Sequence, residues 1–259
     1  MDLGIAGRSA VVCGSSRGLG RACAQALAQA GCIVVVNGRD QARLAATAKE
    51  IADATGAKVI PVAADVTTPE GRALLLGAVP VVDILITNAD GPPPKPFRQI
   101  SPEDVEKGVH SNMVTPIALI QSVIDGMVER GFGRIVNITS GSVKSPIPGL
   151  DVSSGARAGL TAFLAGPARE VAHANVTINN ILPGQFETDR LRSATKRMAE
   201  MRGASVELMT KQRRDAIPAK RFGQPDEFGK LCAFLASEHA GYLTGQNVLI
   251  DGGLFPGAF

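Results

Sequence analysis

Short apolar runs alternate with longer segments of helical periodicity along the whole chain. The apolar runs are rich in Val and Ile and almost uninterrupted, which is typical of strands covered on both faces. We predict strands at Ser9–Cys13, Ile33–Asn37, Val59–Ala63, Val82–Thr87, Arg134–Thr139, Val176–Leu182 and Asn247–Ile250. We predict helices at Gly18–Ala30, Gln41–Ala54, Pro69–Leu76, Pro102–Arg130, Ser153–Ala172 and Pro225–Ser237. The alternation favours an α/β fold with a doubly wound parallel sheet of seven strands and helices on both faces.

A glycine-rich turn joins the first predicted strand to the first predicted helix. Its glycines are Gly14, Gly18 and Gly20. Residues without a Cβ allow a sharp turn and a close approach of backbone N–H groups to a pyrophosphate. The helix start adds unpaired donors and a partial positive charge. A structural turn without a ligand is the alternative, but the position between strand and helix favours a dinucleotide site.

Composition limits the remaining possibilities. The chain has 259 residues, 45% of them hydrophobic and 20% charged, and we predict one domain over residues 1–259. A net charge of +3 gives no sign of nucleic-acid binding, and we expect no such partner. The four cysteines lack metal-type spacing, so we expect buried thiols in a reducing compartment and no metal site. Neither a signal peptide nor a membrane helix is indicated, and we expect a cytoplasmic protein without a membrane partner.

The segment from Thr188 to Arg221 is long, helix-prone and basic. It holds ten Lys and Arg residues against four Asp and Glu residues. One interpretation is a helical lid, at about residues 188–221, that covers an anionic substrate. The other is a pair of solvated, charged helices, and the sequence does not separate the two.

The motifs, in this order and spacing, resemble the short-chain dehydrogenase/reductase family over essentially the whole chain. The matching residues are Gly14, Gly18, Gly20, Asp65, Val66, Asn88, Ala89, Asn112, Ser140, Pro183, Gly184, Thr188, Thr244–Gln246 and Asp251–Gly253. The resemblance implies a Rossmann-type fold and a dinucleotide bound by the turn, which includes Ser16, Arg17 and Leu19. It implies catalytic roles for Asn112 and Ser140, and a homotetramer with a dimer as the alternative.

One defining motif of the family differs. Counting from Ser140 places Ser153 and Arg157 where the family has Tyr and Lys of Tyr-x-x-x-Lys, and the only tyrosine is Tyr242. In the family, Tyr gives a proton to the carbonyl oxygen, and Lys lowers its pKa. Ser is a far weaker acid, and Arg does not release its proton. The pattern resembles a branch labelled 3-oxoacyl-carrier-protein reductase-like, with Ser153 and Arg157 as candidate catalytic residues.

The charges after the second predicted strand favour NADP over NAD. Asn37 stands where NAD-binding proteins carry an acid, and Arg39 follows it. Together with Arg17, Arg39 can bind a 2′-phosphate through charge-assisted hydrogen bonds. The alternative is that both arginines are surface charges and that Asp40 binds the ribose of NAD.

Three functions remain compatible with the sequence. The first is an NADP-dependent oxidoreductase with an atypical proton donor, acting on a carbonyl or hydroxyl compound such as a 3-oxoacyl thioester on acyl carrier protein or coenzyme A. The second is a catalytically weak or inactive NADP-binding protein with a regulatory role. The third is a lyase or isomerase on the same scaffold, because a fold does not determine the chemistry.

Overall fold

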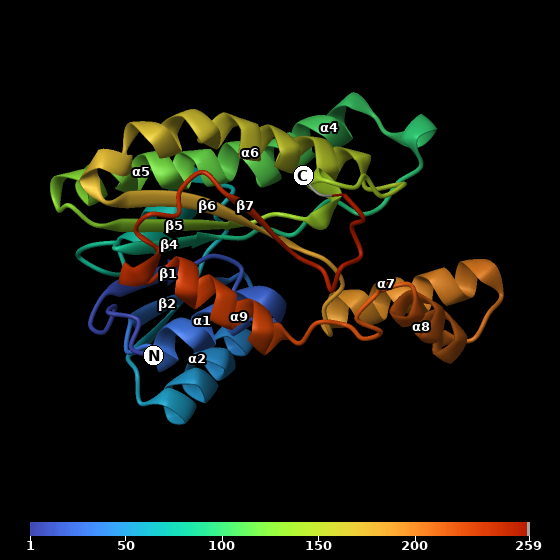
Figure 1. The fold of residues 1–259 in the computed structure, drawn as a ribbon, viewed down its shortest axis with the longest axis horizontal. Helices are drawn as coiled ribbons and strands as arrows, with labels where there is room; N and C mark the ends of the chain where they lie inside the picture. The colour runs from blue at the N-terminus through green and yellow to red at the C-terminus, as the bar shows by residue number, and fades with distance from the viewer. Residues whose placement is uncertain (258–259) are drawn as a thin grey trace.

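A seven-stranded parallel sheet runs through the centre of the structure, a computed structural model that describes residues 1–257 (Figure 1). The strands are β1 (Ser9–Val12), β2 (Ile33–Gly38), β3 (Val59–Ala63), β4 (Ile84–Thr87), β5 (Gly133–Ile138), β6 (Val176–Pro183) and β7 (Asn247–Ile250). Their order is β3-β2-β1-β4-β5-β6-β7. The predicted fold class and all seven strands are confirmed, and no strand end moves by more than two residues. Residues 258–259, the last two of the predicted domain, lie outside the described part.

Helices cover both faces of the sheet (Figure 1). On one face lie α1 (Gly18–Gln29), α2 (Gln41–Thr55) and α9 (Pro225–Leu235); on the other lie α3 (Pro69–Leu76), α4 (Pro102–Val109), α5 (Thr115–Glu129) and α6 (Asp151–Glu170). Each face has its own hydrophobic cluster, with Leu27 and Phe228 buried in the first and Met127 and Leu164 in the second. The nearly continuous apolarity of the strands therefore follows from burial on both sides.

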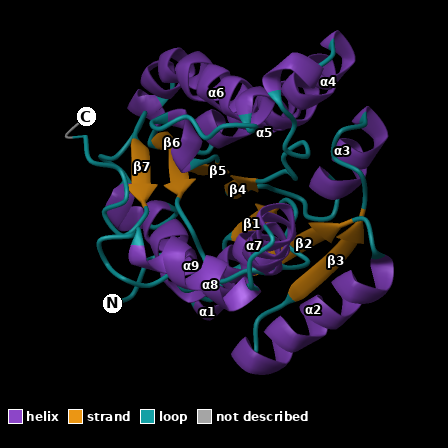
Figure 2. Cartoon of the chain, turned by 90° about the vertical axis from the view of Figure 1, so that its right-hand side faces the viewer, coloured by secondary structure: helices purple, strands orange, loops and turns teal. Residues whose placement is uncertain are grey.

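Two helices belong to neither layer. They are α7 (Asp189–Arg202) and α8 (Val206–Asp215), which form within the predicted basic segment. Figure 1 shows them at one end of the sheet, and Figure 2, viewed from that end, shows α7 in front of β1. A small cluster of Leu191, Ile217 and Phe222 holds the base of this pair.

The prediction of one continuous α-helix over Pro102–Arg130 is wrong in its middle. A π-helical turn at His110–Val114 separates α4 from α5, and the N–H of Thr115 donates to the carbonyl of His110. Pro116 has no amide hydrogen, so the carbonyl of Asn112 lacks its usual α-helical partner. The wider turn follows from this missing bond.

The strand order reverses direction between β1 and β4. Ligands of open parallel sheets bind at the carboxyl edge near such a reversal.

All four cysteines are free and buried, as predicted, and burial raises the pKa of Cys13 and of Cys32 to about 12. Within residues 1–257, no helix combines the length and the apolarity needed to cross a bilayer.

Candidate active site

The turn between β1 and α1 tolerates only glycine at key positions. Gly14 and Gly18 have φ angles of 54° and 59°, in the left-handed region that favours glycine. A Cβ on Gly20 would lie 2.4 Å from the carbonyl oxygen of Gly14. The helix start behind this turn has no side-chain cap, whereas Asp40, Thr68, Ser101, Thr188 and Ser205 each cap their helices. The first N–H groups of α1 are therefore available to an anion, and the turn fits a pyrophosphate.

Two asparagines hold the turn against the sheet. Asn88, directly after β4, donates its side-chain N–H to the carbonyl of Gly14 at 3.1 Å. The side-chain oxygen of Asn37 accepts the N–H of Gly14 at 3.2 Å, and its amide group donates to the carbonyls of Val62 and Ala64. Only 3% of the Asn37 side chain is exposed, so its hydrogen bonds stabilise the backbone at the carboxyl edge of the sheet and it does not face a ligand.

The charged residues near β2 have defined partners. The Asp40 carboxylate accepts the N–H of Arg43 and begins α2 as a cap. Arg39 reaches across to Asp90, which follows β4, with 3.5 Å between the charged atoms, and both side chains are exposed. The pKa of Asp189 is lowered by its hydrogen bond with Arg192 first and then by nearby charges, including that of Arg17. Gly18, which follows Arg17 in the chain, lies beside the start of α7, because a Cβ on it would be 3.9 Å from the methyl group of the capping residue Thr188.

Asp65 is engaged in a tight turn after β3. Its carboxylate accepts the backbone N–H of Thr67 at 2.9 Å and the hydroxyl of the same residue at 2.7 Å. These hydrogen bonds are the main reason why the pKa of Asp65 is lowered. The carbonyl of the neighbouring Val66 accepts from Arg72 at 3.2 Å, so the predicted Asp65-Val66 pair has a fixed backbone.

Ser153 and Arg157 lie one turn apart on α6, and both are buried with 6% exposure. The guanidinium of Arg157 donates to the hydroxyl of Ser153 at 3.2 Å, to the carbonyl of Ile138 at 2.8 Å and to that of Ala89 at 3.0 Å. It therefore joins α6 to the chain just after β4 and to the end of β5. Burial, followed by the charge of Arg190, lowers the pKa of Arg157 to about 10, so the group is charged at neutral pH.

Ser140 and Asn112 occupy the two segments that pack beside the start of α6. The oxygen of Ser140 accepts the N–H of Ser142 at 3.1 Å and its hydroxyl at 2.9 Å. Asn112 lies in the π-helical turn and donates to the hydroxyl of Ser111 at 2.7 Å. Its buried side-chain oxygen has no hydrogen-bond partner within residues 1–257. Both segments contact α6, so the structure gathers the candidate catalytic residues around one helix.

The segment after β6 connects this region to the glycine turn. A Cβ on Gly141 would lie 3.3 Å from the carbonyl oxygen of Pro183, next to Ser140. A Cβ on Gly18 would lie 3.9 Å from the methyl group of Thr188. Residues 183–188 therefore extend from the turn at Ser140 to the glycine turn.

Two residues that the sequence analysis did not assign to the site also meet there. A Cβ built on Gly91 would lie 2.9 Å from Arg190 Nη2 and 3.2 Å from Ser153 Oγ. Arg190 was one of ten bases in a charged segment, and no pattern distinguished it. Its position next to Ser153 depends on how α7 packs, which local sequence does not show.

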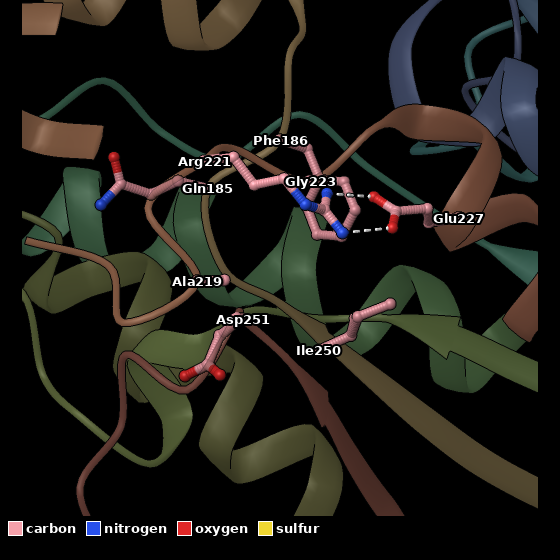
Figure 3. A pocket seen from close by; sticks show the side chains of 9 residues that line it. Gln185, Phe186, Ala219, Arg221, Gly223, Glu227, Ile250 and Asp251 are labelled. Carbon is pink, nitrogen blue, oxygen red and sulfur yellow. Dashed lines mark hydrogen bonds and ion pairs between the residues drawn. The ribbon is translucent and has the colours of Figure 1, made fainter. Parts of the chain in front are cut away.

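Two cavities lie at this end of the molecule. One, of about 280 Å³, includes Gly91 and is lined by Asp90, Gly91, Pro92, Pro93, Asp104, Lys107, Gly108 and Ser111. The other, of about 210 Å³, lies beside the ends of β6 and β7 (Figure 3). Its charged groups are already paired, because Arg221 makes two 2.7 Å hydrogen bonds to Glu227 and Asp251 accepts backbone N–H groups. The first cavity is the one that includes Gly91, whose backbone lies beside Ser153.

Comparison with known proteins identifies the family. The sequence model of a family described as enoyl-(acyl carrier protein) reductase matches residues 14–255. The chain belongs to the short-chain dehydrogenase/reductases. It is similar to 3-oxoacyl-[acyl-carrier-protein] reductase of Aquifex aeolicus, with 33% identity over 98% of this chain and 100% of the relative. It also resembles acetoacetyl-CoA reductase of Allochromatium vinosum, with 32% identity over 96% of this chain and 98% of the relative.

A solved structure agrees with this assignment. L-sorbose reductase of Gluconobacter frateurii, complexed with NADPH and L-sorbose, superposes with a TM-score of 0.93 and 29% identity, over 99% of this chain and 100% of that chain. The expected family and fold are confirmed. As a short-chain dehydrogenase/reductase, the protein is an NAD(P)-dependent oxidoreductase that acts on carbonyl or hydroxyl groups.

Proposed function

We propose that this short-chain dehydrogenase/reductase uses NADP to interconvert a carbonyl and a hydroxyl group, with an atypical proton-donor site. The observation that carries the proposal is the uncapped start of α1 behind a turn that only glycine can form. The bound dinucleotide would meet Gly14, Ser16, Arg17, Gly18, Leu19 and Gly20 at the phosphates, Asp65, Val66, Asn88 and Ala89 along its length, and Pro183, Gly184 and Thr188 at the nicotinamide.

NADP is favoured over NAD by the surroundings of the adenosine end. Arg39 is exposed at the end of β2 and Arg17 lies in the turn, so we expect both guanidiniums to bind a 2′-phosphate, Arg39 in exchange for its exposed partner Asp90. Asp40 already serves α2 as its cap, which speaks against its use as a ribose-binding acid. The similar L-sorbose reductase was solved with NADPH. NADP supplies or accepts the hydride when it is bound.

Two hydroxyls would bind the substrate oxygen. Ser140 and Ser153 each accept hydrogen bonds from this chain, but neither donates its own proton to any residue in the described range. Both protons can therefore point to a carbonyl oxygen. Arg157 holds Ser153 in place and stays charged, so it does not relay a proton. We propose that a water bound to the partnerless oxygen of Asn112 delivers it.

The names of two similar proteins support a substrate class to test. Two similar proteins are named for 3-oxoacyl-carrier-protein and acetoacetyl-CoA reduction, so a 3-oxoacyl thioester is the substrate to test first.

We propose that residues 188–221 act as the lid of a single domain over residues 1–259. We also propose a cytoplasmic homotetramer, in line with the exposed apolar side chains of Val105, Val114 and Phe163 on the α4–α6 side.

A second candidate is an NADP-binding protein with little turnover. It is favoured by Ser153, because an aliphatic hydroxyl is a much weaker acid than the phenol that the family uses there. In this case NADP occupancy would serve regulation or assembly.

The decisive test measures NADPH binding and NADPH oxidation separately. Calorimetry should detect NADPH binding, and absorbance should detect its oxidation with one member of a panel of 3-oxoacyl thioesters and simple ketones. The double substitution Ser153→Tyr with Arg157→Lys should raise the rate by about a hundredfold, the usual contribution of a positioned general acid. Binding without oxidation by either protein would favour the second candidate, and absence of binding would refute both.

A further inference from the structure

His110 connects two turns that lie far apart in the sequence. Its ring nitrogen Nε2 lies 3.0 Å from the carbonyl oxygen of Thr67, in the turn after β3. A carbonyl oxygen only accepts hydrogen bonds, so Nε2 carries the hydrogen and donates it. His110 itself begins the π-helical turn that contains Asn112. The bond therefore joins the turn of Asp65 to the turn of Asn112.

The Thr67 side of this bond is firmly held. The carboxylate of Asp65 accepts both the N–H and the hydroxyl of Thr67, at 2.9 Å and 2.7 Å. Arg72 on α3 donates to the carbonyls of Val66 and Thr67, at 3.2 Å each. The oxygen to which His110 donates thus has a fixed position.

The Asn112 side makes mostly local hydrogen bonds. The Asn112 amide donates to the hydroxyl of Ser111 at 2.7 Å, and that hydroxyl donates to the carbonyl of Gly108 at 3.3 Å. Both bonds stay within one stretch of helix. Within residues 1–257, only His110 makes a side-chain hydrogen bond from the π-helical turn to a segment outside residues 102–129.

The position of His110 in its turn determines what this bond can do. Residues two apart in a helical turn point to nearly opposite sides. His110 is exposed where it contacts Thr67, whereas Asn112 is buried with 1% exposure. Rotation of the turn about its own axis would move both side chains together. A fixed partner for His110 therefore limits that rotation and keeps the partnerless oxygen of Asn112 in place.

We propose that His110 is a positioning residue for Asn112 and links it to the adenosine end of the bound dinucleotide. The proposal rests on the proposed function, which assigns Asp65 and Val66 to the cofactor and Asn112 to the proton-delivering water. A dinucleotide bound at the Asp65 turn would hold the carbonyl that His110 contacts. Binding at one turn then affects the other, because coupling between two sites is reciprocal. The simpler alternative is a surface bond that only adds stability.

Two variants separate the hydrogen bond from the bulk of the side chain. His110→Leu removes the donor, and His110→Gln places an amide N–H close to the position of Nε2. We expect His110→Leu to lower kcat for NADPH oxidation about threefold, the low end for one hydrogen bond, because the contact is exposed to water. The KM of the carbonyl substrate should not change, since the lost bond acts on proton delivery and not on substrate binding. His110→Gln should restore most of kcat.

A second measurement does not depend on turnover. Adenosine 2′,5′-bisphosphate, the adenosine half of NADP, is added at saturation, and backbone hydrogen exchange is followed by mass spectrometry. In the unaltered protein, we expect it to slow exchange in residues 65–72 and also in residues 108–116. In His110→Leu, the slower exchange should be confined to residues 65–72. His110→Gln should recover the protection of residues 108–116.

His173→Leu is the matched control. His173 is exposed like His110, and its Nδ1 lies 2.8 Å from the carbonyl of Glu170, three residues earlier in the chain. The same substitution there should leave kcat and the exchange pattern unchanged. Urea denaturation of each variant checks that it is folded under the assay conditions.

Four results would overturn the inference. They are an exchange pattern unchanged by His110→Leu, a kcat unchanged by His110→Leu, a His110→Gln variant that behaves like His110→Leu, and no effect of the bisphosphate on residues 108–116 of the unaltered protein. A different result separates the proposed function from this link. If protection of residues 108–116 depends on His110 but no carbonyl compound oxidises NADPH, the proposed function is refuted and the link between the two turns is supported.

Discussion

The glycine turn after β1 and the surroundings of Ser153 lie at the same edge of the sheet but are built in different ways. The turn offers backbone N–H groups, and its geometry excludes side chains, as the 2.4 Å approach at Gly20 shows. The Ser153 region offers side chains from α6, α7 and the π-helical turn, held by hydrogen bonds such as those of Arg157. A site made of backbone depends on one residue type, whereas a site made of side chains can be rebuilt by exchanging them. This difference fits the expectation from the sequence that the turn keeps the family pattern while the Ser153 region departs from it.

The largest effect is expected from Gly20→Ala. The new Cβ would force the carbonyl of Gly14 and the side chain of Asn88 apart, and both help to shape the turn. Displacing two N–H donors from a phosphate should cost about 4 kcal/mol of NADP binding. Calorimetric titration measures this loss. Gly155→Ala on α6 is the control, because its Cβ would meet nothing within 4 Å; similar affinities in the two variants would contradict the backbone model of the turn.

Arg157→Ala should produce the next largest effect, on folding stability. It leaves the carbonyls of Ile138 and Ala89 without their donor and opens a void beside α6. We expect a loss of about 3 kcal/mol in the free energy of unfolding, measured by urea denaturation. Arg157→Lys keeps the charge but reaches fewer of the acceptors, so it should lose less. If Arg157→Ala unfolds at the same urea concentration as the unaltered protein, the hydrogen bonds of Arg157 to Ile138 and Ala89 do not stabilise the packing of α6.

The smallest effect, on NADP binding, is expected from Asp90→Asn. Asp90 follows β4, close to the Ser153 region, and pairs with Arg39 at the predicted cofactor end. Asp90 holds the guanidinium of Arg39 at 3.5 Å in an exposed pair. Releasing Arg39 for the 2′-phosphate should strengthen NADP binding by at most about threefold, because exposed pairs are weak. NAD binding should not change, since NAD carries no 2′-phosphate. An equal gain for both coenzymes would mean that Arg39 does not read this phosphate.

Much of the fold was predictable because its signals are local. Apolar runs of Val and Ile marked the seven strands. The start of α4 also carried a local signal, because Pro102 stands in its first turn and Ser101 and Asp104 form a capping box. The break at Asn112 was missed, although Pro116 carried the signal, because proline in a first helical turn is also a normal start. Asp40 allowed a reading as a ribose-binding acid, and only the structure shows it as a cap.

The candidate site was predictable where a motif names a residue and not where packing brings residues together. Gly14, Ser140 and Ser153 follow from the motifs that resemble the family. The contact of Arg190 with the Ser153 region does not, because a charged helix rich in arginine gives no sign of which side chain turns inward. The role of Arg157 as a brace was also hidden, since its acceptors are backbone carbonyls that no pattern marks.

By itself, the sequence determined the alternation of strands and helices, the glycine turn and the family, because hydrophobic periodicity and the backbone freedom of glycine act between neighbours in the chain. Only the tertiary structure decided that residues 91, 153 and 190 lie next to one another and that the side chain of Asn37 bonds to the backbone at the sheet edge. Those outcomes depend on how whole elements pack across the sheet, and that packing is set by many weak contacts between distant segments.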